Sequence, residues 1–469
     1  MIYLKKIIKN NYEKFKNEPY IYEKINDKFE PITYSKFIEH SLSIANDLKE
    51  FKNKKIIIYS ENSTKLMECD LAITFYVGTS VVVSKEWKYD DLYSAIKEED
   101  IKCLIYSNRY KEIVEKLKKQ FNIKYICMDD IKYNFKKEYL EMTPKPYDKL
   151  AKIVFSSGTT GRSKAVKLSL KNIFSGLNSL LRRCKFTEND SAYLFLPLNH
   201  TYAAVYNFLY SVIVGYKLYL ATSTKNIGQE LLETNPTIFC AVPLVYNNLL
   251  KAYGENVDKA FGKNIKYLFC GGAPLEKETR RIYKEKHLNL MQAYALSETA
   301  SSFAIAYPYT DDLESVGQIF EDIDVKIVDK DKDGIGEIIV KGDNVFLGYT
   351  DESLNKRVFD KNGYFHTGDL GYIKDKKLFL KGRKKKMLLT SNGENIEAAY
   401  IENKIKSLNK NIADVKTYIK NDKIAANIYI TKQTDIDKTI KEYNDNAPIY
   451  ERINEFFTFE DSIDTRLKQ

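Results

Sequence analysis

The sequence predicts an α/β protein. A large N-terminal domain of mixed and parallel sheets with helices, plus a small barrel-like subdomain, is followed by a small α+β C-terminal domain. Three observations support this expectation. Strand-like and helix-like segments alternate through residues 1–150, short strands separated by turn dipeptides take over from about Lys326, and shorter, more charged segments follow Gly382. We place the two domains at residues 1–381 and 382–469.

The N-terminal alternation is typical of a largely parallel sheet with crossover helices. Ile56–Tyr59 is a short β-rich run, Ser80–Val83 resembles a second strand, and Lys102–Tyr106 is apolar again. Lys111–Lys119, which follows, has the charge pattern of a surface helix. Parallel strands need such crossover connections, so this order favours an α/β sheet over a hairpin meander.

The longest apolar stretch, Tyr202–Tyr216, is interrupted by Asn207 and falls short of the roughly 18–20 residues that cross a bilayer. We therefore expect a buried helix there and no transmembrane segment. The Lys-rich start, Met1–Asn17, lacks the uninterrupted apolar core and cleavage site of a signal peptide.

The region from about Lys326 contains four turn dipeptides: Asp333-Gly334, Lys341-Gly342, Asn362-Gly363 and Gly368-Asp369. Glycine supplies the positive φ that tight hairpin turns need, so each dipeptide predicts a chain reversal between short strands. This pattern predicts hairpins or a small barrel.

The composition excludes several classes of protein. The chain has 469 residues, a net charge of +10, 44% hydrophobic residues and 36 tyrosines, which is incompatible with low-aromatic disorder. Acidic and basic residues alternate along the chain, whereas nucleic-acid binders concentrate basic residues, so we expect no nucleic-acid partner. The cysteines show neither zinc-ligand spacing nor a disulfide framework, which favours a cytoplasmic protein. They are Cys69, Cys103, Cys127, Cys184, Cys240 and Cys270.

The strongest local motif is Ile153-Val-Phe-Ser-Ser-Gly-Thr-Thr-Gly-Arg-Ser-Lys164-Ala-Val166. An apolar strand enters a loop of hydroxyls and glycines that ends in a lysine. Glycines let backbone N–H groups surround phosphate oxygens, and the lysine adds a positive charge. A Walker loop would need G-x-x-x-x-G-K-[ST], but Ser163 precedes the lysine and Ala165 follows it. A structural Gly/Ser turn between two strands is the remaining alternative.

This motif resembles the signature S-[ST]-G-T-T-G-x-P-K-G-V of the adenylate-forming enzymes, with Ser163 in place of Pro and Ala165 in place of Gly. That family includes acyl-CoA synthetases, peptide-synthetase adenylation domains and firefly luciferase. Further family blocks follow in the expected order, so the resemblance covers roughly residues 20–469. They are Leu196-Pro-Leu-Asn-His200, Gly271-Gly-Ala-Pro-Leu275, Gln292-Ala-Tyr-Ala-Leu-Ser-Glu-Thr299, Tyr364-Phe-His-Thr-Gly-Asp-Leu370, and Gly382-Arg-Lys-Lys-Lys-Met387 with Asn392-Gly-Glu-Asn-Ile396.

The resemblance implies that residues 1–381 are an AMP-binding domain that binds ATP and Mg²⁺, and it gives each block a role. Carboxylates and phosphate oxygens suit Mg²⁺, and Glu298 matches the family's metal ligand. The loop would bind phosphate, the Gly271 turn and Tyr294 would face the adenine, Ser297 the α-phosphate, and Asp369 with Arg383 the ribose. The residues expected to bind cofactors are Ser156, Ser157, Gly158, Thr159, Thr160, Gly161, Lys164, Gly272, Ala273, Pro274, Ala293, Tyr294, Ser297, Asp369, Arg383 and Gly393.

The resemblance also implies that the C-terminal domain is mobile and pivots at Lys385. One orientation would serve adenylation, and the other would serve transfer to a thiol; a few boundary residues commonly absorb such a motion. Gly393 matches the loop that guides pantetheine. Lys386 stands where many members have Asp or Glu, and Ala398 where many have Pro.

The largest departure from the family lies at the C-terminus. The family has a catalytic lysine there, and alignment on Phe459 and Leu467 puts Arg466 at its position. Arginine keeps the charge but not the compact shape of an ammonium group. Three alternatives stay open: Arg466 serves as the cation at a reduced rate, Lys468 reaches in instead, or the first half-reaction is impaired.

The expected catalytic residues are Lys164, His200, Glu298 and Arg466, with Glu298 as the metal ligand. His200 matches the residue that gates the acyl pocket, although a core histidine would also fit. Amino-acid-activating members usually carry an Asp near this block, and Asn199–Ala204 contains none, so a fatty or aromatic acid is favoured.

The resemblance implies ATP-dependent activation of a carboxylic acid to an acyl-adenylate, followed by transfer to a thiol, most often that of coenzyme A. Two alternatives remain. The acceptor is the phosphopantetheine of a separate acyl or peptidyl carrier protein, or the chain binds nucleotide without adenylation.

Overall fold

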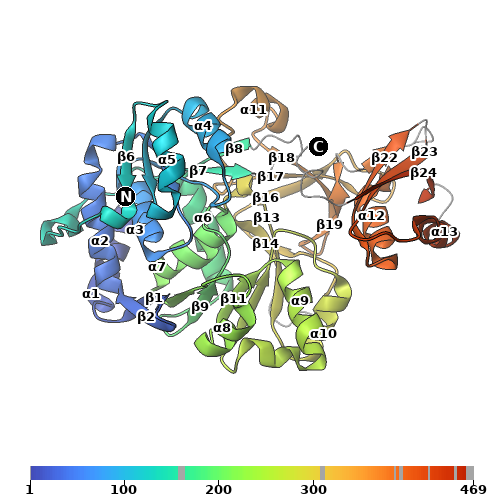
Figure 1. The fold of residues 1–469 in the computed structure, drawn as a ribbon, viewed down its shortest axis with the longest axis horizontal. Helices are drawn as coiled ribbons and strands as arrows, with labels where there is room; N and C mark the ends of the chain where they lie inside the picture. The colour runs from blue at the N-terminus through green and yellow to red at the C-terminus, as the bar shows by residue number, and fades with distance from the viewer. Residues whose placement is uncertain are drawn as a thin grey trace. The chain divides into compact units, whose positions relative to one another are not determined.

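The computed structural model describes residues 2–156, 164–306, 312–384, 387–389, 395–420, 423–447 and 451–460. The chain divides into two compact units (Figure 1). Unit 1 comprises Met1–Asp324, Val340–Phe365 and Asp375–Leu378. Unit 2 comprises Val325–Ile339, His366–Lys374 and Phe379–Gln469.

The larger sheet of unit 1 has a parallel centre. Neighbouring strands pair in parallel from β13 through β12, β11, β9 and β10 to β1, and antiparallel strands flank them on both sides. In spatial order its strands are β15 (Gly317–Ile319), β14 (Ser302–Ile305), β13 (Leu290–Ala295), β12 (Tyr267–Cys270), β11 (Ile238–Ala241), β9 (Ser191–Leu194), β10 (Lys217–Leu220), β1 (Pro19–Ile25) and β2 (Lys28–Thr33). Parallel strands with crossover helices confirm the predicted α/β class.

The second sheet of unit 1 is also mostly parallel. Its order is β6 (Lys124–Cys127), β5 (Ile101–Tyr106), β3 (Lys55–Tyr59), β4 (Thr79–Val82), β7 (Leu150–Ser156) and β8 (Lys164–Ser169). Only the β7–β8 pair is antiparallel. The three strands expected from the sequence between residues 56 and 106 are therefore present, with ends shifted by a residue or two.

The helices of unit 1 begin and end where local chemistry allows. Ser63 caps α3 by accepting a hydrogen bond from the Leu66 N–H at 3.2 Å, and Pro243 opens α9, where no N–H partner is needed. The helices are α1 (Ile2–Lys14), α2 (Tyr34–Asp47), α3 (Thr64–Ala72), α4 (Tyr89–Glu98), α5 (Lys111–Lys118), α6 (Leu170–Arg183), α7 (Tyr210–Val214), α8 (Ile227–Thr234), α9 (Pro243–Tyr253), α10 (Lys277–Glu285) and α11 (Glu352–Val358).

The short helical segments include two π-helices, η2 (Ile73–Val77) and η6 (Tyr202–Leu209). The apolar stretch at 202–216 forms η6 and α7 and is mostly buried, as predicted. The 3₁₀ turns are η1 (Lys49–Phe51), η3 (Asn108–Tyr110), η4 (Met128–Asp130), η5 (Lys137–Glu141), η7 (Gly254–Phe261) and η8 (Ser297–Thr299). Among the described residues, no helix is long and apolar enough to cross a membrane.

Among the described residues, two of the apolar clusters show how helices of unit 1 pack on its sheets. In one, Leu231 of α8, Tyr246 of α9 and Tyr283 of α10 pack on β9, β11 and β12, and Figure 1 shows these helices beside that sheet. In the other, Leu92 of α4 and Val114 of α5 pack on β3, β4 and β5. Burying such side chains supplies the main favourable free energy of folding.

Unit 2 contains most of a row of neighbouring strands: β16 (Asp324–Val328), β17 (Gly336–Lys341), β18 (Phe365–Lys374) and β19 (Lys377–Arg383). Gly334 and Gly363 lie in turns with φ of 76° and 79°, as predicted. The prediction of a turn at Gly368-Asp369 was wrong, because that pair lies inside β18. The reversal into β19 occurs at Asp375 and Lys376, with φ of 50° and 61°, as in a type I′ hairpin turn.

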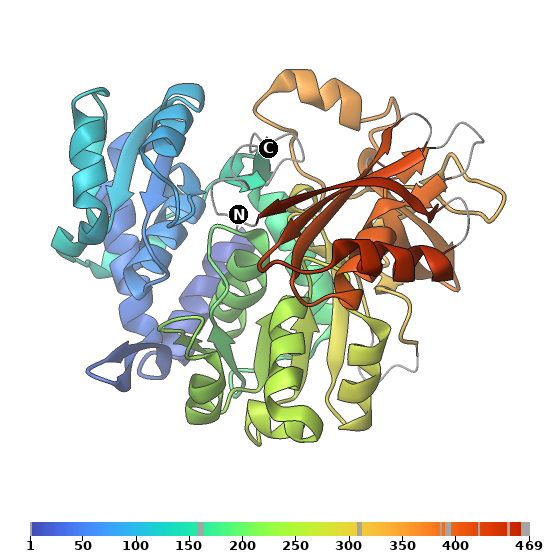
Figure 2. The same cartoon turned by 45° about the vertical axis from the view of Figure 1, so that its right-hand side comes forward.

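The rest of unit 2 is the small α+β domain expected near the C-terminus. A three-stranded sheet of β22 (Ile412–Lys420), β23 (Lys423–Ile430) and β24 (Ile453–Glu460) packs against α12 (Ala398–Leu408) and α13 (Ile436–Asn446) (Figure 2). Ile401, Ile428 and Ile440 belong to the shared core. A two-stranded hairpin, β20 (Met387–Leu389) with β21 (Asn395–Glu397), precedes it. The predicted pivot, Lys385, lies outside the described residues.

Candidate active site

The candidate site in unit 1 begins at one edge of the larger sheet. Because β9, β11, β12 and β13 run parallel, their carboxyl ends lie at the same edge. Open α/β sheets bind ligands at this edge. Three predicted blocks follow these strand ends directly: the loop to His200 after β9, the Gly271 turn after β12, and Leu296–Thr299 after β13.

The Gly271 turn approaches other elements closely. Its backbone N–H donates to the Ala241 carbonyl at 3.3 Å, and an added Cβ would lie 3.5 Å from the Tyr202 ring. Gly272 has a φ of 83°, which disfavours other residues. Gly272, Ala273 and Pro274 are exposed, so this turn presents backbone to solvent at the sheet edge.

The structure buries the aromatic residue expected to face the adenine. Ala293 and Tyr294 are both buried on β13, and the Tyr294 ring packs edge-on against Phe303 at 4.9 Å between centroids. Ser297 follows the strand and is half-buried at the start of η8. The aromatic packing fixes the position of the tyrosine at the edge that carries the Gly271 turn.

Glu298 is anchored at both its main chain and its side chain. Its carbonyl accepts a hydrogen bond from the Phe346 N–H at 2.8 Å, and its Oε1 accepts one from the Tyr349 hydroxyl at 2.6 Å. The carboxylate is half-buried. Among the described residues, no group of three or more His, Cys, Asp or Glu side chains could by itself hold a metal ion. A lone carboxylate still fits Mg²⁺, which commonly uses one or two carboxylates together with substrate phosphates.

The phosphate-loop motif forms the connection of the β7–β8 hairpin. Ser156 pairs with Lys164 at the mouth of the hairpin, and the Ser156 hydroxyl donates weakly to the Lys164 carbonyl at 3.4 Å. The Lys164 ammonium lies 5.2 Å from the centroid of the Tyr349 ring, within cation–π range. The strand that enters the motif and the lysine that ends it are therefore paired, and residues 157–163 between them lie outside the described part of the chain.

Tyr349 connects two of the predicted catalytic residues, because its hydroxyl contacts Glu298 and its ring lies beneath Lys164. The sequence analysis did not identify it. Nothing in its local pattern distinguishes it from the other tyrosines, since its role depends on which elements the fold brings together.

His200 follows β9 in a loop held by an asparagine that the sequence analysis also missed. The Asn62 side-chain amide donates to the Leu196 carbonyl at 2.8 Å, and its oxygen accepts from the Leu198 N–H at 3.1 Å. The His200 carbonyl accepts from the Ala204 N–H, so the histidine leads into η6. Its ring surface is exposed, but protein packed around it excludes enough water to lower its pKa, which favours neutral imidazole at neutral pH.

Unit 2 holds the other predicted pair. Asp369 is buried on β18, and its Oδ1 lies 2.8 Å from Nε of Arg383, which remains about half exposed. A guanidinium held by one carboxylate retains further N–H donors. The structure thus brings these two residues together, as the resemblance implies.

Glu337 organises the neighbourhood of that pair in unit 2. Its carboxylate accepts hydrogen bonds from Lys384 Nζ at 2.9 Å, His366 Nδ1 at 3.1 Å and the Gly368 N–H at 3.1 Å. Burial acts to raise the pKa of Glu337, but hydrogen bonds from Lys384 and His366 outweigh it, so the pKa is lowered. Sequence analysis did not single out Glu337.

The remaining predicted residues lie outside the described part of the chain. They are Ser157, Gly158, Thr159, Thr160 and Gly161 of the loop, together with Gly393, Arg466 and Lys468.

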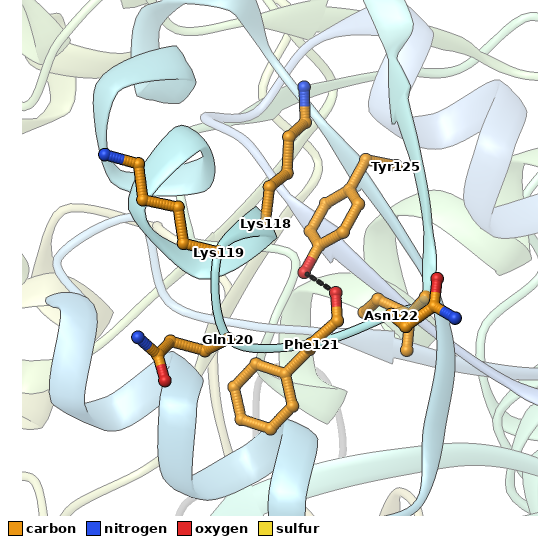
Figure 3. A pocket seen from close by; sticks show the side chains of 7 residues that line it. Lys118, Lys119, Gln120, Phe121, Asn122 and Tyr125 are labelled. Atoms are coloured by element: carbon orange, nitrogen blue, oxygen red, sulfur yellow. Dashed lines mark hydrogen bonds between the residues drawn. The ribbon is translucent and has the colours of Figure 1, made fainter.

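A surface depression of about 370 Å³ lies elsewhere in unit 1, between α5 and β6 (Figure 3). Its wall includes Lys118, Phe121 and Tyr125, and the Tyr125 hydroxyl donates to the Phe121 carbonyl at 3.2 Å. None of the predicted site residues lines it, so it is not part of the candidate site.

Comparison with known proteins identifies the family of the chain. The family model "AMP-binding enzyme" matches residues 8–350. A 2-succinylbenzoate–CoA ligase from Oceanobacillus iheyensis is 26% identical over 385 residues, covering 79% of this chain and 78% of that protein. A long-chain-fatty-acid–CoA ligase from Rattus norvegicus is 27% identical, covering 54% of this chain and 43% of that protein.

Solved structures share the fold. O-succinylbenzoate CoA synthetase (MenE) from Bacillus subtilis, in complex with an acyl-adenylate intermediate, superposes with a TM-score of 0.81 at 21% identity, covering 97% of this chain and 94% of that one. ATP-bound MatB from Rhodopseudomonas palustris gives a TM-score of 0.81 at 20% identity, covering 97% and 95%. MenE has also been solved with ATP and a magnesium ion. These likenesses confirm the predicted fold class.

Proposed function

Because the chain belongs to the AMP-binding enzyme family, we propose that it activates a carboxylic acid with ATP and transfers the acyl group to the thiol of coenzyme A. The observation that carries the proposal is that Lys164 and Glu298 both contact Tyr349, Lys164 at the ring and Glu298 at the hydroxyl. A phosphate-loop lysine and a single carboxylate at adjacent positions suit a Mg²⁺–triphosphate, which carries both anionic oxygens and a cation.

In the first step, a carboxylate oxygen of the acid attacks the α-phosphorus of ATP, and pyrophosphate leaves with the electron pair of the broken P–O bond. Lys164 and the loop donors would stabilise the charge on the phosphate oxygens. Glu298 would hold Mg²⁺, which supplies charge neutralisation on the phosphates when bound. Ser297 would contact the α-phosphate, and the Asp369–Arg383 pair would bind the ribose hydroxyls.

In the second step, the thiol sulfur attacks the acyl carbon, AMP leaves, and the thiol proton passes to solvent. We further propose that unit 2 pivots at Lys385 between the two steps and that Gly393 guides the pantetheine arm. Binding the acyl-adenylate in a water-poor site would limit its hydrolysis.

For the acid, the proposal favours a fatty or aromatic carboxylate. His200 leads into the buried apolar segment η6, and Asn199–Ala204 offers no acidic side chain for an amino group. The relatives named for 2-succinylbenzoate and long-chain fatty acids support the same classes.

For the acceptor, coenzyme A is the first choice because the relatives are named CoA ligases. A separate acyl carrier protein is the second choice, since the net charge of +10 would suit an acidic partner. We propose no nucleic-acid partner.

Pyrophosphate release from ATP and Mg²⁺ tests the function. A panel of fatty, aromatic and amino acids, with and without coenzyme A, should give release with one acid class. Arg466→Lys should accelerate the reaction if the arginine limits adenylation, whereas Lys468→Ala should slow it if that lysine supplies the cation. Glu112→Gln is a suitable control because Glu112 pairs with Lys116 through an exposed ion pair. Absence of release with every acid, in native protein and in Arg466→Lys, would contradict the proposed function.

A further inference from the structure

Tyr349 makes two different contacts with two different elements. The residue is 3% exposed, and its hydroxyl donates to Glu298 Oε1 at 2.6 Å. The face of its ring lies 5.2 Å from the Lys164 ammonium. Glu298 belongs to η8, which follows β13 of the larger sheet, and Lys164 begins β8 of the second sheet. One side chain therefore contacts residues at the strand connections of both sheets.

The backbone around Tyr349 is fixed to both elements. The Phe346 N–H donates to the Glu298 carbonyl at 2.8 Å. Along β8, the Leu347 N–H donates to the Lys167 carbonyl at 2.9 Å, and the Thr350 N–H donates to the Ala165 carbonyl at 3.0 Å. Backbone hydrogen bonds from residues 346–350 therefore connect β8 with η8.

Asn355 of α11 restrains Tyr349 from the other side. Its Oδ1 accepts from the Tyr349 N–H at 2.7 Å, and its Nδ2 donates to the Tyr349 carbonyl at 3.1 Å. Gly348 has a φ of 109°, and a Cβ there would come within 2.9 Å of the Asn355 oxygen. The main chain of the tyrosine is thus held independently of its two side-chain contacts.

The two contacts act on different charges. A hydroxyl that donates a hydrogen bond to a carboxylate oxygen restricts rotation of the carboxylate. Hydrogen bonds to charged groups are stronger than those between neutral groups. An aromatic face attracts an ammonium without offering it a carboxylate partner, so the ammonium stays suited to a phosphate. Tyr349 thereby favours one orientation for the metal-binding carboxylate and one position for the phosphate-binding lysine.

We propose that Tyr349 is a positioning residue that aligns Glu298 for Mg²⁺ and Lys164 for the phosphates of the nucleotide. This inference rests on the proposed function for the identity of the ligand. It assigns Tyr349 no contact with the reacting atoms.

The test measures ATP affinity by calorimetric titration with Mg²⁺ and again with EDTA. Tyr349→Phe removes the hydroxyl and keeps the ring. It should weaken binding of Mg²⁺–ATP about tenfold or more, the effect of losing one hydrogen bond to a charged group, and leave ATP binding in EDTA unchanged. Tyr349→Leu removes the ring as well and should weaken binding in both conditions.

The matched control is Tyr133→Phe. Its hydroxyl also donates to a glutamate, Glu68, at 2.6 Å, on elements that carry no predicted site residue. This control should bind ATP like the native protein in both conditions. Thermal unfolding of all variants shows whether any loss of affinity merely follows loss of folded protein.

Equal weakening by Tyr349→Phe with and without Mg²⁺, or no weakening at all, would overturn the inference. The failure of the proposed function looks different: native protein would bind Mg²⁺–ATP but release no pyrophosphate with any acid, while the Mg²⁺-specific effect of Tyr349→Phe persisted. Native protein that binds no ATP would overturn both.

Discussion

Lys145 is a buried residue that contacts the start of β7, the strand that leads to the phosphate-loop motif. Its ammonium donates to the Gly78 carbonyl and, at 3.1 Å, to the Leu150 carbonyl, where β7 begins. Burial, and then repulsion from Lys152, lower the pKa of Lys145 from 10.5 to about 7. Lys152 itself is paired with the buried carboxylate of Asp70. Keeping Lys145 protonated therefore costs free energy in the folded protein.

This lowered pKa predicts a dependence of stability on pH. Between about pH 7 and 10.5 the unfolded chain binds the Lys145 proton and the folded chain releases it. The free energy of unfolding should therefore rise with pH in this window, by up to about 1.4 kcal/mol per pH unit. Urea unfolding of native protein and Lys145→Met at several pH values measures this contribution. The free energy of unfolding of the variant should change less with pH than that of native protein. Parallel curves for the two proteins would contradict the assignment of this pH dependence to Lys145.

At the residue scale, the sequence predicts a site residue only where that residue belongs to a recognisable motif. The Ser/Gly/Thr loop with Lys164, the Gly271 turn and Glu298 all belong to recognisable blocks. Tyr349, Asn62 and Glu337 could not be predicted, because each acts by contacting residues far away in the sequence. A tyrosine or a glutamate carries no local signal for such a contact.

At the scale of elements, close packing of β14 and β15 supports the strand that carries Tyr294. Gly317 on β15 has a φ of 109°, and an added Cβ would lie 1.9 Å from the backbone carbon of Ile305 on β14. Since β14 pairs directly with β13, a shift there would reach Tyr294. The glycine is required both by its conformation and by the lack of space.

Gly317→Ala should therefore destabilise unit 1 more than a glycine substitution that meets no neighbour. Gly254 is the matched control, because its φ is 54° but a Cβ there would meet nothing within 4 Å. Both variants strain the backbone, and only Gly317→Ala adds a backbone clash. We expect its free energy of unfolding to fall further by about 1–3 kcal/mol, measured by urea unfolding. Equal losses would show that the close approach is relieved without cost.

Elements were predictable where the pattern was local. Apolar β-rich runs gave β3, β4 and β5, and alternating charge gave α5. The hairpin turns were less predictable. Gly368-Asp369 has a turn composition but lies within β18, where Gly368 adopts a φ of 73°, whereas the reversal at Asp375-Lys376 contains no glycine. Tertiary pairing of the strands decides which residues must turn.

At the scale of the whole molecule, the chain is an AMP-binding enzyme whose two units each hold part of the predicted machinery. Unit 1 carries Lys164, Glu298 and the Gly271 turn, and unit 2 carries Asp369 and Arg383. The order of the blocks predicted this family and fold. The pivot at Lys385 stays a prediction, as does the role of Arg466.

We expect the chain to form an acyl-adenylate at a site that needs Glu298. Acid-dependent exchange of labelled pyrophosphate into ATP, without coenzyme A, tests it most directly, because only a reversible adenylation step returns the label. We predict exchange with a fatty or aromatic acid, reduced on the order of 100-fold in Glu298→Gln. Exchange that needs no acid, or that is unchanged in Glu298→Gln, would contradict the account.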